Sequence, residues 1–359
     1  MYPLLRPLLF RLPPETAHRL ALDLLGAAHR TGILKALAAP PTAAPVVAMG
    51  LTFPNPVGLA AGFDKDAEQV AALAALGFGF VEVGTVTPRP QPGNPPPRLF
   101  RLPEAEALIN RMGFNNRGVE ALAARLARRR AGVPVGVNIG KNRDTPLERA
   151  VEDYLYCLER VHAVADYVAV NLSSPNTPGL RALQEEDQLA ALLEALTARL
   201  RRLDAARGRR VPLAVKIAPD LADEAVRRIA RRLREAGVDG VIATNTTLAR
   251  PGCERHPLAG EAGGLSGRPL RRRSTEVVRI LAEELSGELA IVAVGGIDGP
   301  EAAVEKLAAG ADLVQLYTGL VYRGPRLVHE VAAALAAARN GQTATASRPA
   351  SSRSRSSRA

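Results

Sequence analysis

The chain has 359 residues, of which 47% are hydrophobic, so it is long enough and apolar enough to bury a large core. Its two cysteines, Cys157 and Cys253, lie far apart and indicate neither a disulfide framework nor a metal site, which favours a reducing compartment. The net charge of +11 makes nucleic acid or anionic lipid the partners to consider. No apolar run approaches the roughly 18 residues of a membrane-spanning helix.

The first forty residues predict a hairpin of two amphipathic helices. An apolar stretch with two arginines, Arg6 and Arg11, is followed after Pro13-Pro14 by apolar residues at helical spacing up to Ala28. The leucines of the first stretch are Leu4, Leu5, Leu8, Leu9 and Leu12. Such a hairpin can lie in a membrane interface; the alternative is that its leucines cover the bottom of the fold. The arginines and prolines interrupt any apolar core of a cleaved signal, so we expect a cytosolic protein with peripheral attachment.

The rest of the chain alternates between strand-like and helix-like segments. Eight runs rich in β-branched residues each end in Gly, Asn, Lys or Thr, as strands do where they meet a loop. They are Val57–Gly62, Phe80–Val86, Val133–Ile139, Tyr167–Leu172, Leu213–Ala218, Gly240–Thr246, Leu289–Gly296 and Leu313–Gly319. Segments with apolar residues at three-to-four spacing separate them: Asp66–Leu76, Val119–Arg130, Thr145–Val164, Asp187–Leu203, Asp223–Ala236, Leu270–Leu285 and Pro300–Ala309.

This alternation predicts an α/β fold with a parallel sheet and helical crossovers. Eight units favour a closed (β/α)8 TIM barrel, whose chemistry lies at the carboxyl ends of its strands. A doubly wound open sheet is the alternative architecture. We prefer the barrel because functional-looking residues follow all eight strands and do not gather at one switch point.

Polar side chains at the predicted strand ends form one candidate site. Lys65 follows the first strand and Lys216 ends the fifth, although the chain has only five lysines. Asn138 and Asn171 end the third and fourth strands, and the sixth ends in Thr244-Asn245-Thr246. Several amides and two ammonium groups at a barrel mouth suit an electron-rich heteroaromatic ring.

Two further features point to catalysis and to a phosphate. The segment Asn171–Leu180 sets amides and hydroxyls between two prolines and can bring a serine against a planar ligand; a turn-rich loop is the alternative. The glycine clusters Gly263–Gly267, Gly295-Gly296 and Tyr317–Gly319 can cradle a phosphate, and tight turns are the alternative. A phosphate cradle, a lysine and an amide-lined pocket together predict an enzyme that uses flavin mononucleotide (FMN).

The combination of these motifs resembles one known family, over about Met1 to Asn340. The motifs are Ala61–Lys65, Asn110–Asn116, Asn171–Arg181, Thr244–Thr246, Gly263–Pro269 and Val294–Ile297. The chain resembles the quinone-linked, membrane-associated class 2 dihydroorotate dehydrogenases, which oxidise dihydroorotate to orotate in pyrimidine synthesis. Soluble relatives carry a cysteine as base; here Cys157 and Cys253 lie outside the motif, which places the chain with the serine class.

The resemblance implies roles for individual residues. Ser174 would take the C5 proton of dihydroorotate while a hydride leaves C6 for flavin N5, with a proton relay through water or Thr177. Substrate contacts would come from Lys65, Asn110, Arg111, Met112, Gly113, Phe114, Asn171, Asn176, Asn245 and Thr246. FMN contacts would come from Ala61, Gly62, Phe63, Asp64, Lys65, Thr85, Asn138, Asn171, Lys216, Thr244, Gly267, Gly296, Tyr317 and Thr318, the last being a serine in many relatives. Positions that line the quinone path in relatives match His18, Arg101 and Tyr317.

The predicted organisation has three parts: a helical extension for membrane and quinone access at 1–40, the barrel at 41–340, and a disordered Ser/Arg-rich tail at 341–359. We expect a monomer that binds an anionic lipid surface at the cytoplasmic face of the cell membrane. We also expect it to transfer electrons to a membrane quinone and to hold no metal. Specific nucleic-acid binding is not expected, because the arginines are spread over predicted helices and aromatic residues make up only 4%. The rival functions are a class I aldolase using Lys216 as a Schiff-base amine and a non-catalytic basic binding protein.

Overall fold

A computed structural model describes residues 2–37, 42–129, 131–177 and 179–346. Eight parallel strands close into a barrel in the order β10-β12-β13-β3-β4-β7-β8-β9, which confirms the (β/α)8 prediction over the open sheet. Its strands are β3 (Val57–Leu59), β4 (Phe80–Val86), β7 (Val135–Ile139), β8 (Tyr167–Asn171), β9 (Leu213–Ile217), β10 (Gly240–Ala243), β12 (Ala290–Val294) and β13 (Leu313–Leu316). They are buried almost throughout, which explains why they are continuous apolar runs and do not alternate.

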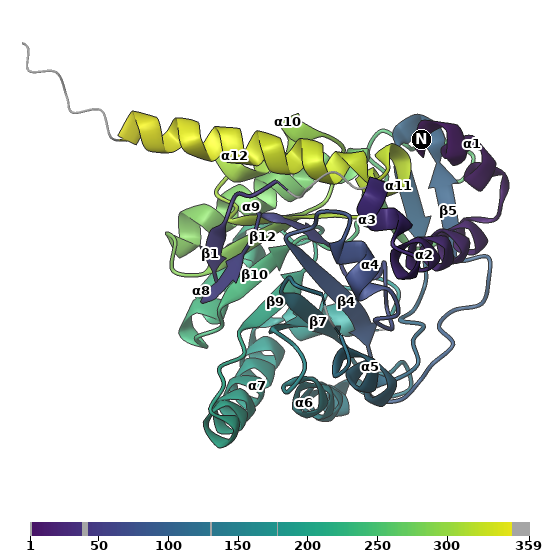
Figure 1. Cartoon of the computed structure of the whole chain (residues 1–359). Coiled ribbons are helices and arrows are strands. Elements are labelled where there is room, and N and C mark those ends of the chain that lie inside the picture. Colours follow the sequence, from purple (N-terminus) through teal and green to yellow (C-terminus); the bar gives the residue numbers. More distant parts are fainter. Residues whose placement is uncertain (1, 38–41, 130, 178, 347–359) are drawn as a thin grey trace, which may run out of the picture.

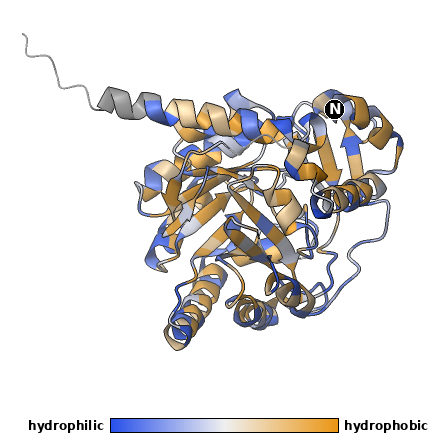
Figure 2. Ribbon diagram, viewed as in Figure 1, coloured by the Kyte–Doolittle hydropathy of each residue, from blue (hydrophilic) through white to orange (hydrophobic). Residues whose placement is uncertain are grey.

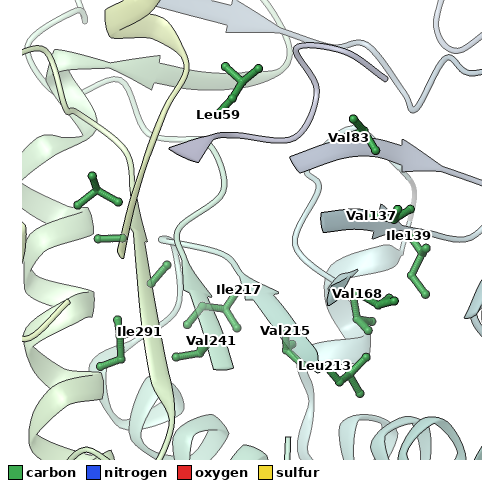
Figure 3. Close-up of a cluster of buried hydrophobic side chains, with 14 of the residues drawn as sticks. Leu59, Val83, Val137, Ile139, Val168, Leu213, Val215, Ile217, Val241 and Ile291 are labelled. Carbon is green, nitrogen blue, oxygen red and sulfur yellow. The ribbon is translucent and has the colours of Figure 1, made fainter. Parts of the chain in front are cut away.

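Helices surround the barrel and seal its outer face (Figure 1). They are α4 (Val70–Ala74), α5 (Val119–Leu126), α6 (Ala150–Val161), α7 (Glu186–Arg207), α8 (Asp223–Glu235), α9 (Arg271–Leu285), α10 (Pro300–Ala308), α11 (Thr318–Arg323) and α12 (Arg326–Ala346). The outward side chains of the strands, such as Val83, Val137 and Val241, join the apolar faces of these helices in one large core (Figure 3). Helix periodicity in the sequence therefore reflects burial against the barrel.

A hairpin closes the bottom of the barrel. Strands β1 (Val46–Ala48) and β2 (Leu51–Phe53) pair antiparallel, and Phe53 is buried against the inward ring of Phe80 with centroids 5.1 Å apart. The inward position Gly58 has no room for a side chain, since a Cβ there would lie 2.2 Å from the Phe80 ring. With the amino ends of the strands plugged in this way, the carboxyl ends form the open face.

A three-stranded antiparallel sheet lies at that open face and was not predicted. It consists of β5 (Leu99–Leu102), β6 (Ala107–Asn110) and β11 (Gly264–Gly267) in the order β11-β6-β5. The glycine cluster Gly263–Gly267, expected to form a phosphate cradle or a tight turn, contains the strand β11, which pairs with β6 in the register Asn110↔Gly264. Glycine is needed at Gly264 because a Cβ would lie 1.9 Å from Thr246 Oγ1.

The N-terminal segment forms α1 (Tyr2–Arg11), α2 (Pro14–Arg30) and α3 (Ile33–Leu37). These helices lie beside β5 and α4 (Figure 1) and not under the barrel, so the alternative that their leucines cover its bottom is wrong. Figure 2 shows hydrophobic residues recurring along α1, and Leu4, Leu5 and Leu8 are exposed there. Among the described residues, no helix combines the length and the hydropathy needed to cross a membrane.

Several predicted boundaries differ from the structure by a few residues, and the C-terminal helix was missed. Helix α4 is shorter than the predicted 66–76, because the Asp64 carboxylate accepts hydrogen bonds from the amides of Glu68 and Gln69, at 2.9 and 2.7 Å, and holds that stretch in turns. Helix α12 was not among the predicted helices; it runs from Arg326 to Ala346 and so enters the segment that composition assigned to the tail. The remainder of that segment, 347–359, lies outside the described residues, as do Pro178 of the serine loop and Arg130.

Candidate active site

A single cavity with about 1130 Å³ of empty space opens between the strand ends and the three-stranded sheet. Most of the predicted site residues line it. They are Ala61, Gly62, Lys65, Thr85, Asn110, Met112, Gly113, Phe114, Asn171, Ser174, Asn176, Lys216, Thr244, Asn245, Thr246, Gly267, Gly296, Tyr317 and Thr318. Residues more than 250 positions apart in the sequence therefore share one site, because the barrel closes β13 onto β3.

A network of amides forms one wall of this cavity. Asn171 Nδ2 donates to Thr85 Oγ1 at 2.9 Å and to Asn138 Oδ1 at 3.2 Å. Its Oδ1 in turn accepts from Asn245 Nδ2 at 3.3 Å, and Asn245 also donates to Ser173 Oγ at 3.0 Å. Each amide orients the next, so the polar groups facing a ligand are held in place before it binds.

The network rests on a buried carboxylate inside the barrel. Glu82 accepts hydrogen bonds from Asn138 Nδ2 at 2.9 Å, Tyr167 Oη at 2.8 Å and Gln315 Nε2 at 2.7 Å. With its NH2 group donating to Glu82, Asn138 turns its oxygen to Thr85 Oγ1 and Asn171 Nδ2, which both donate to it. Glu82 thus sets the orientation of the whole amide wall.

Ser174 lies in the loop after β8, almost fully buried. Its Oγ accepts a hydrogen bond from the amide of Asn176 at 3.2 Å, and Asn176 Nδ2 donates to Asn110 Oδ1 of β6 at 3.2 Å. Arg181 holds the far end of the loop through Asp220, at 2.6 Å. The loop is therefore tied both to the three-stranded sheet and to the barrel, and its serine faces the cavity.

Two lysines place positive charge on the cavity. Burial lowers the pKa of Lys65 to about 8, with Arg98 acting in the same direction and Glu15 opposing. Burial also lowers the pKa of Lys216, while the charge of Glu82 opposes that shift. A bound anion or an electron-rich ring would favour the charged form of both lysines.

The opposite end of the cavity is lined by main chain. A Cβ on Gly296 would lie 2.2 Å from Arg271 Cα, so the two backbones pack directly, and Gly296 lines the cavity. Gly267 lies beside it, and Ser266 Oγ shares a hydrogen bond of 2.8 Å with Thr318 Oγ1. Backbone amides and small hydroxyls in this arrangement are typical of a phosphate site.

The chain was compared with known proteins. Residues 44–338 match the family Dihydroorotate dehydrogenase. A "Dihydroorotate dehydrogenase (quinone)" of Azotobacter vinelandii is 62% identical over 94% of this chain and 98% of its own, and one of Pseudomonas putida is 58% identical over 94% and 99%. The chain belongs to the dihydroorotate dehydrogenase family.

Solved structures agree with this assignment. The DHODH of Eimeria tenella in complex with ferulenol superimposes with a TM-score of 0.82 at 42% identity, covering 91% of this chain and 92% of that one. The ligand-free form from the same organism gives 0.81 at 42% identity, with coverage of 90% and 95%. The barrel is thus shared with dihydroorotate dehydrogenases of known structure.

Four predicted ligand contacts do not line the cavity: Phe63 and Asp64, which line a second cavity, and Arg111 and Asn138. Arg111 turns away, with its guanidinium 2.5 Å from Glu261 Oε2 and stacked 4.6 Å over the Phe100 ring. Asn138 lies beneath the surface and acts through Thr85 and Asn171. The side chains of Arg111 and Asn138 therefore support neighbouring residues and do not line the cavity themselves.

The residues predicted for quinone access separate into two groups. His18 and Phe63 line a second cavity beside α2, as does Asp64, which was predicted to contact FMN. His18 Nε2 is 2.8 Å from Phe63 O, and the ring of Phe63 lies edge-on to those of His18 and Tyr317 at 4.8 and 5.4 Å. Tyr317 lines the main cavity, so an aromatic chain links it to α2. Arg101 is not part of this series of aromatic rings; it donates to Phe10 O and Leu12 O at the end of α1.

Sequence reasoning missed Gln315 and Glu82. Gln315 lines the cavity from β13, and its buried Oε1 has no hydrogen-bond partner among the described residues. The available signal was a polar residue within an otherwise apolar predicted strand, which holds for Glu82 as well. Among the described residues, no cluster of three or more His, Cys, Asp or Glu is placed to hold a metal.

Proposed function

We propose that this chain oxidises (S)-dihydroorotate to orotate in de novo pyrimidine (UMP) biosynthesis, with FMN as hydride acceptor and a membrane quinone as final electron acceptor. The observation that carries the proposal is the convergence of Ser174, the amide wall, Lys65 and the glycine cradle on one cavity. The printed names of the relatives, "Dihydroorotate dehydrogenase (quinone)", support the choice of substrate and acceptor.

The residues of the cavity fit FMN. Dihydroorotate dehydrogenases use a flavin, and the cavity offers a phosphate cradle at Gly267, Gly296 and Thr318 at one end. Lys216 and the unpartnered Gln315 Oε1 lie on the barrel side and supply a positive charge and a free acceptor for the ring system. When bound, FMN would accept the hydride from C6 of dihydroorotate and pass the electrons on to quinone.

The protein's own part in the reaction is to bind the substrate and take a proton. Asn110, Asn171, Asn176 and Asn245 offer donors and acceptors for the ring amides, and Lys65 offers a charge for the carboxylate. Ser174 takes the proton from C5. A serine is a weak base at its ordinary pKa, so burial of the loop and relay through water or another hydroxyl assist the transfer.

The N-terminal helices provide the route to quinone. The exposed leucines of α1 and α2 lie in the interface of an anionic membrane at its cytoplasmic face, with the protein a peripheral monomer. Quinone approaches the flavin past His18, Arg101 and Tyr317. Burial lowers the pKa of His18 to about 4, with Lys65 acting in the same direction, so at neutral pH its imidazole is uncharged and adds little to the cost of admitting an apolar quinone.

Steady-state turnover tests the proposed function. The purified protein, supplied with dihydroorotate and a soluble quinone analogue, should form orotate and reduced quinone in equal amounts, followed by their ultraviolet absorbance. Orotate formation that requires a nicotinamide cofactor would contradict the proposed acceptor. A protein without flavin that borohydride traps on Lys216 with a carbonyl substrate would contradict the whole proposal and favour an aldolase.

A further inference from the structure

One lysine of this chain is entirely buried outside the cavity. Lys306 lies on α10 with 0% of its surface exposed. Its Nζ donates to Ser274 Oγ and Thr275 Oγ1, both at 2.6 Å, and to Arg271 O at 3.0 Å. All three acceptors are uncharged oxygens in the first turn of α9, so the ammonium uses its three donors without contacting a carboxylate.

This contact leads directly to the glycine cradle. Ser274 Oγ, which accepts from Lys306, also donates to Gly295 O at 2.9 Å. The neighbouring Gly296 packs on the backbone of Arg271, whose carbonyl oxygen is another acceptor of Lys306. Lys306 therefore holds the first turn of α9 against the two glycines that line the phosphate end of the cavity.

Nearby carboxylates do little to balance the positive charge of Lys306 in the protein without a ligand. Burial lowers the pKa of Lys306 to about 7, and Arg271 and Arg279 on α9 shift it in the same direction. Glu305 opposes them, but its carboxylate is also bonded to the Arg271 guanidinium, at 2.6 Å. An anion at the cradle would favour the charged form of Lys306, and by reciprocity the charged lysine would favour the anion.

We propose that Lys306 is a positioning residue for the FMN phosphate: through Ser274 and the Arg271 carbonyl it fixes the Gly295-Gly296 backbone, and its ammonium adds an attraction for the phosphate dianion from behind the cradle. This inference rests on the proposed function, since it concerns the phosphate of the flavin. It assigns a role in cofactor selection to a residue that makes no contact with the cofactor.

A purely structural role would differ in one measurable respect. If Lys306 only joined α9 to α10, its loss would weaken binding of any flavin through general destabilisation. If it acts on the phosphate, its loss weakens FMN and leaves riboflavin, which lacks the phosphate, nearly unaffected. The ratio of the two dissociation constants separates these cases.

The experiment uses the full-length chain, stripped of flavin and titrated with FMN or riboflavin while quenching of flavin fluorescence is followed. For Lys306→Met, which keeps the length of the side chain, the preference for FMN over riboflavin should fall about tenfold or more. Ser274→Ala keeps the charge but removes the link to Gly295 O, and should lower the same preference about threefold.

Lys141→Met is the matched control. Lys141 is also buried and donates to main-chain oxygens, Asn142 O at 3.1 Å and Thr145 O at 2.8 Å, but it has no contact with α9 or the cradle. Its variant should keep the wild-type preference for FMN, whatever its stability. A preference lost equally in Lys141→Met would assign the effect to general destabilisation and overturn the inference.

The outcomes distinguish this inference from the proposed function. A wild-type protein that prefers FMN, with that preference intact in Lys306→Met and Ser274→Ala, would overturn the inference and leave the function standing. A wild-type protein that binds FMN no better than riboflavin would overturn both. If Lys306→Met does not fold, Ser274→Ala decides, and an unchanged preference in that variant overturns the inference.

Discussion

Ser174 is the residue on which the proposed chemistry depends most. It is almost fully buried, lies in the cavity and is held by a loop tied to β6 and to the barrel. Ser174→Ala removes the proton acceptor and leaves every proposed flavin contact in place. Reduction of the bound flavin by dihydroorotate should therefore slow about 10²- to 10⁴-fold, measured anaerobically by stopped-flow absorbance, with the flavin content unchanged.

The neighbouring serine provides the control for this prediction. Ser173 is buried, bonds to Asn171 and Asn245, and does not line the cavity. Ser173→Ala should therefore slow flavin reduction far less than Ser174→Ala. Equal losses in the two variants would show that the loop needs its hydroxyls for shape, and would remove Ser174 from its role as base.

Lys65 gives substrate binding a dependence on pH. Because burial lowers its pKa to about 8, its ammonium is charged below that pH and becomes neutral above it in the free protein. Orotate carries the same carboxylate but has already lost the proton that the base removes from C5, so its binding reports on charge without the proton-transfer step. Its affinity should fall as the pH rises through about 8, measured by the perturbation of the flavin spectrum.

Lys65→Met should bind orotate more weakly below pH 8 and should lose most of this fall in affinity. Lys35→Met is the control, since Lys35 is exposed on α3 and lies outside the cavity. If the affinity of Lys65→Met for orotate falls with rising pH as much as that of the wild type, the pH dependence belongs to another group. The proposed contact between Lys65 and the carboxylate would then be wrong.

Single residues differed in how well the sequence predicted their positions. Asn171 and Lys216 could be placed because a polar side chain at the end of an apolar strand has a known location in a barrel. Arg111 could not, because the direction of its side chain depends on Phe100 and Glu261, which lie on other segments. Glu82 was missed because its partners come from three other strands, and hydrogen bonds inside a barrel leave no local pattern.

At the scale of elements, helix α1 exposes leucines whose positions are not explained by packing within the fold. Leu4, Leu5 and Leu8 are 80%, 51% and 58% exposed, although leucine is normally buried. Replacing all three with Gln should leave the fold and flavin reduction intact, since none of the three is buried. Binding to vesicles with anionic lipid should fall, measured by co-sedimentation, together with turnover using a long-chain quinone.

Val47 offers a matched comparison for the α1 variant. It is 73% exposed on β1, at the closed end of the barrel. Val47→Gln should leave vesicle binding unchanged. If it lowers binding as much as the triple variant does, attachment depends on general surface hydropathy, and α1 is not the membrane-binding element.

Most elements of the barrel were predictable, whereas its last helix, α12, and the elements outside the barrel sheet were not. The eight strands and seven helices follow from apolar runs and helical spacing, because each is buried against the next. Strands β5, β6 and β11 have only four residues each, which is too short for a clear pattern. Half of β11 is glycine, and its pairing with β6 joins residues more than 150 positions apart. The hairpin β1–β2 was missed for a similar reason: each of its strands has only three residues.

At the scale of the whole molecule, the positive charge is spread out. Arginines pair with carboxylates on neighbouring segments, for example Arg209 with Asp166 at 3.3 Å and Arg273 with Asp223 at 2.7 Å. Ion pairs distributed over the outer helices do not make the continuous basic stripe that tracks a nucleic-acid backbone. The net charge of +11 fits a general attraction to anionic surfaces better than a specific nucleic-acid interface.

The molecule as a whole also has two distinct ends. The hairpin β1–β2 closes the bottom of the barrel, and the cavity opens at the other end beside α2. In the proposed function, substrate, flavin and quinone therefore all meet at one face, with α1 near it (Figure 1). This polarity would join the proposed half-reactions with dihydroorotate and with quinone in a single site.

The most direct test is an anaerobic absorbance spectrum of the purified protein, recorded before and after addition of dihydroorotate and again after addition of a soluble quinone analogue. We predict a flavin band that bleaches with dihydroorotate and returns with quinone. A flavin band that ignores dihydroorotate would contradict the proposed substrate, and a colourless protein that cannot be reconstituted with FMN would contradict the cofactor and the chemistry together.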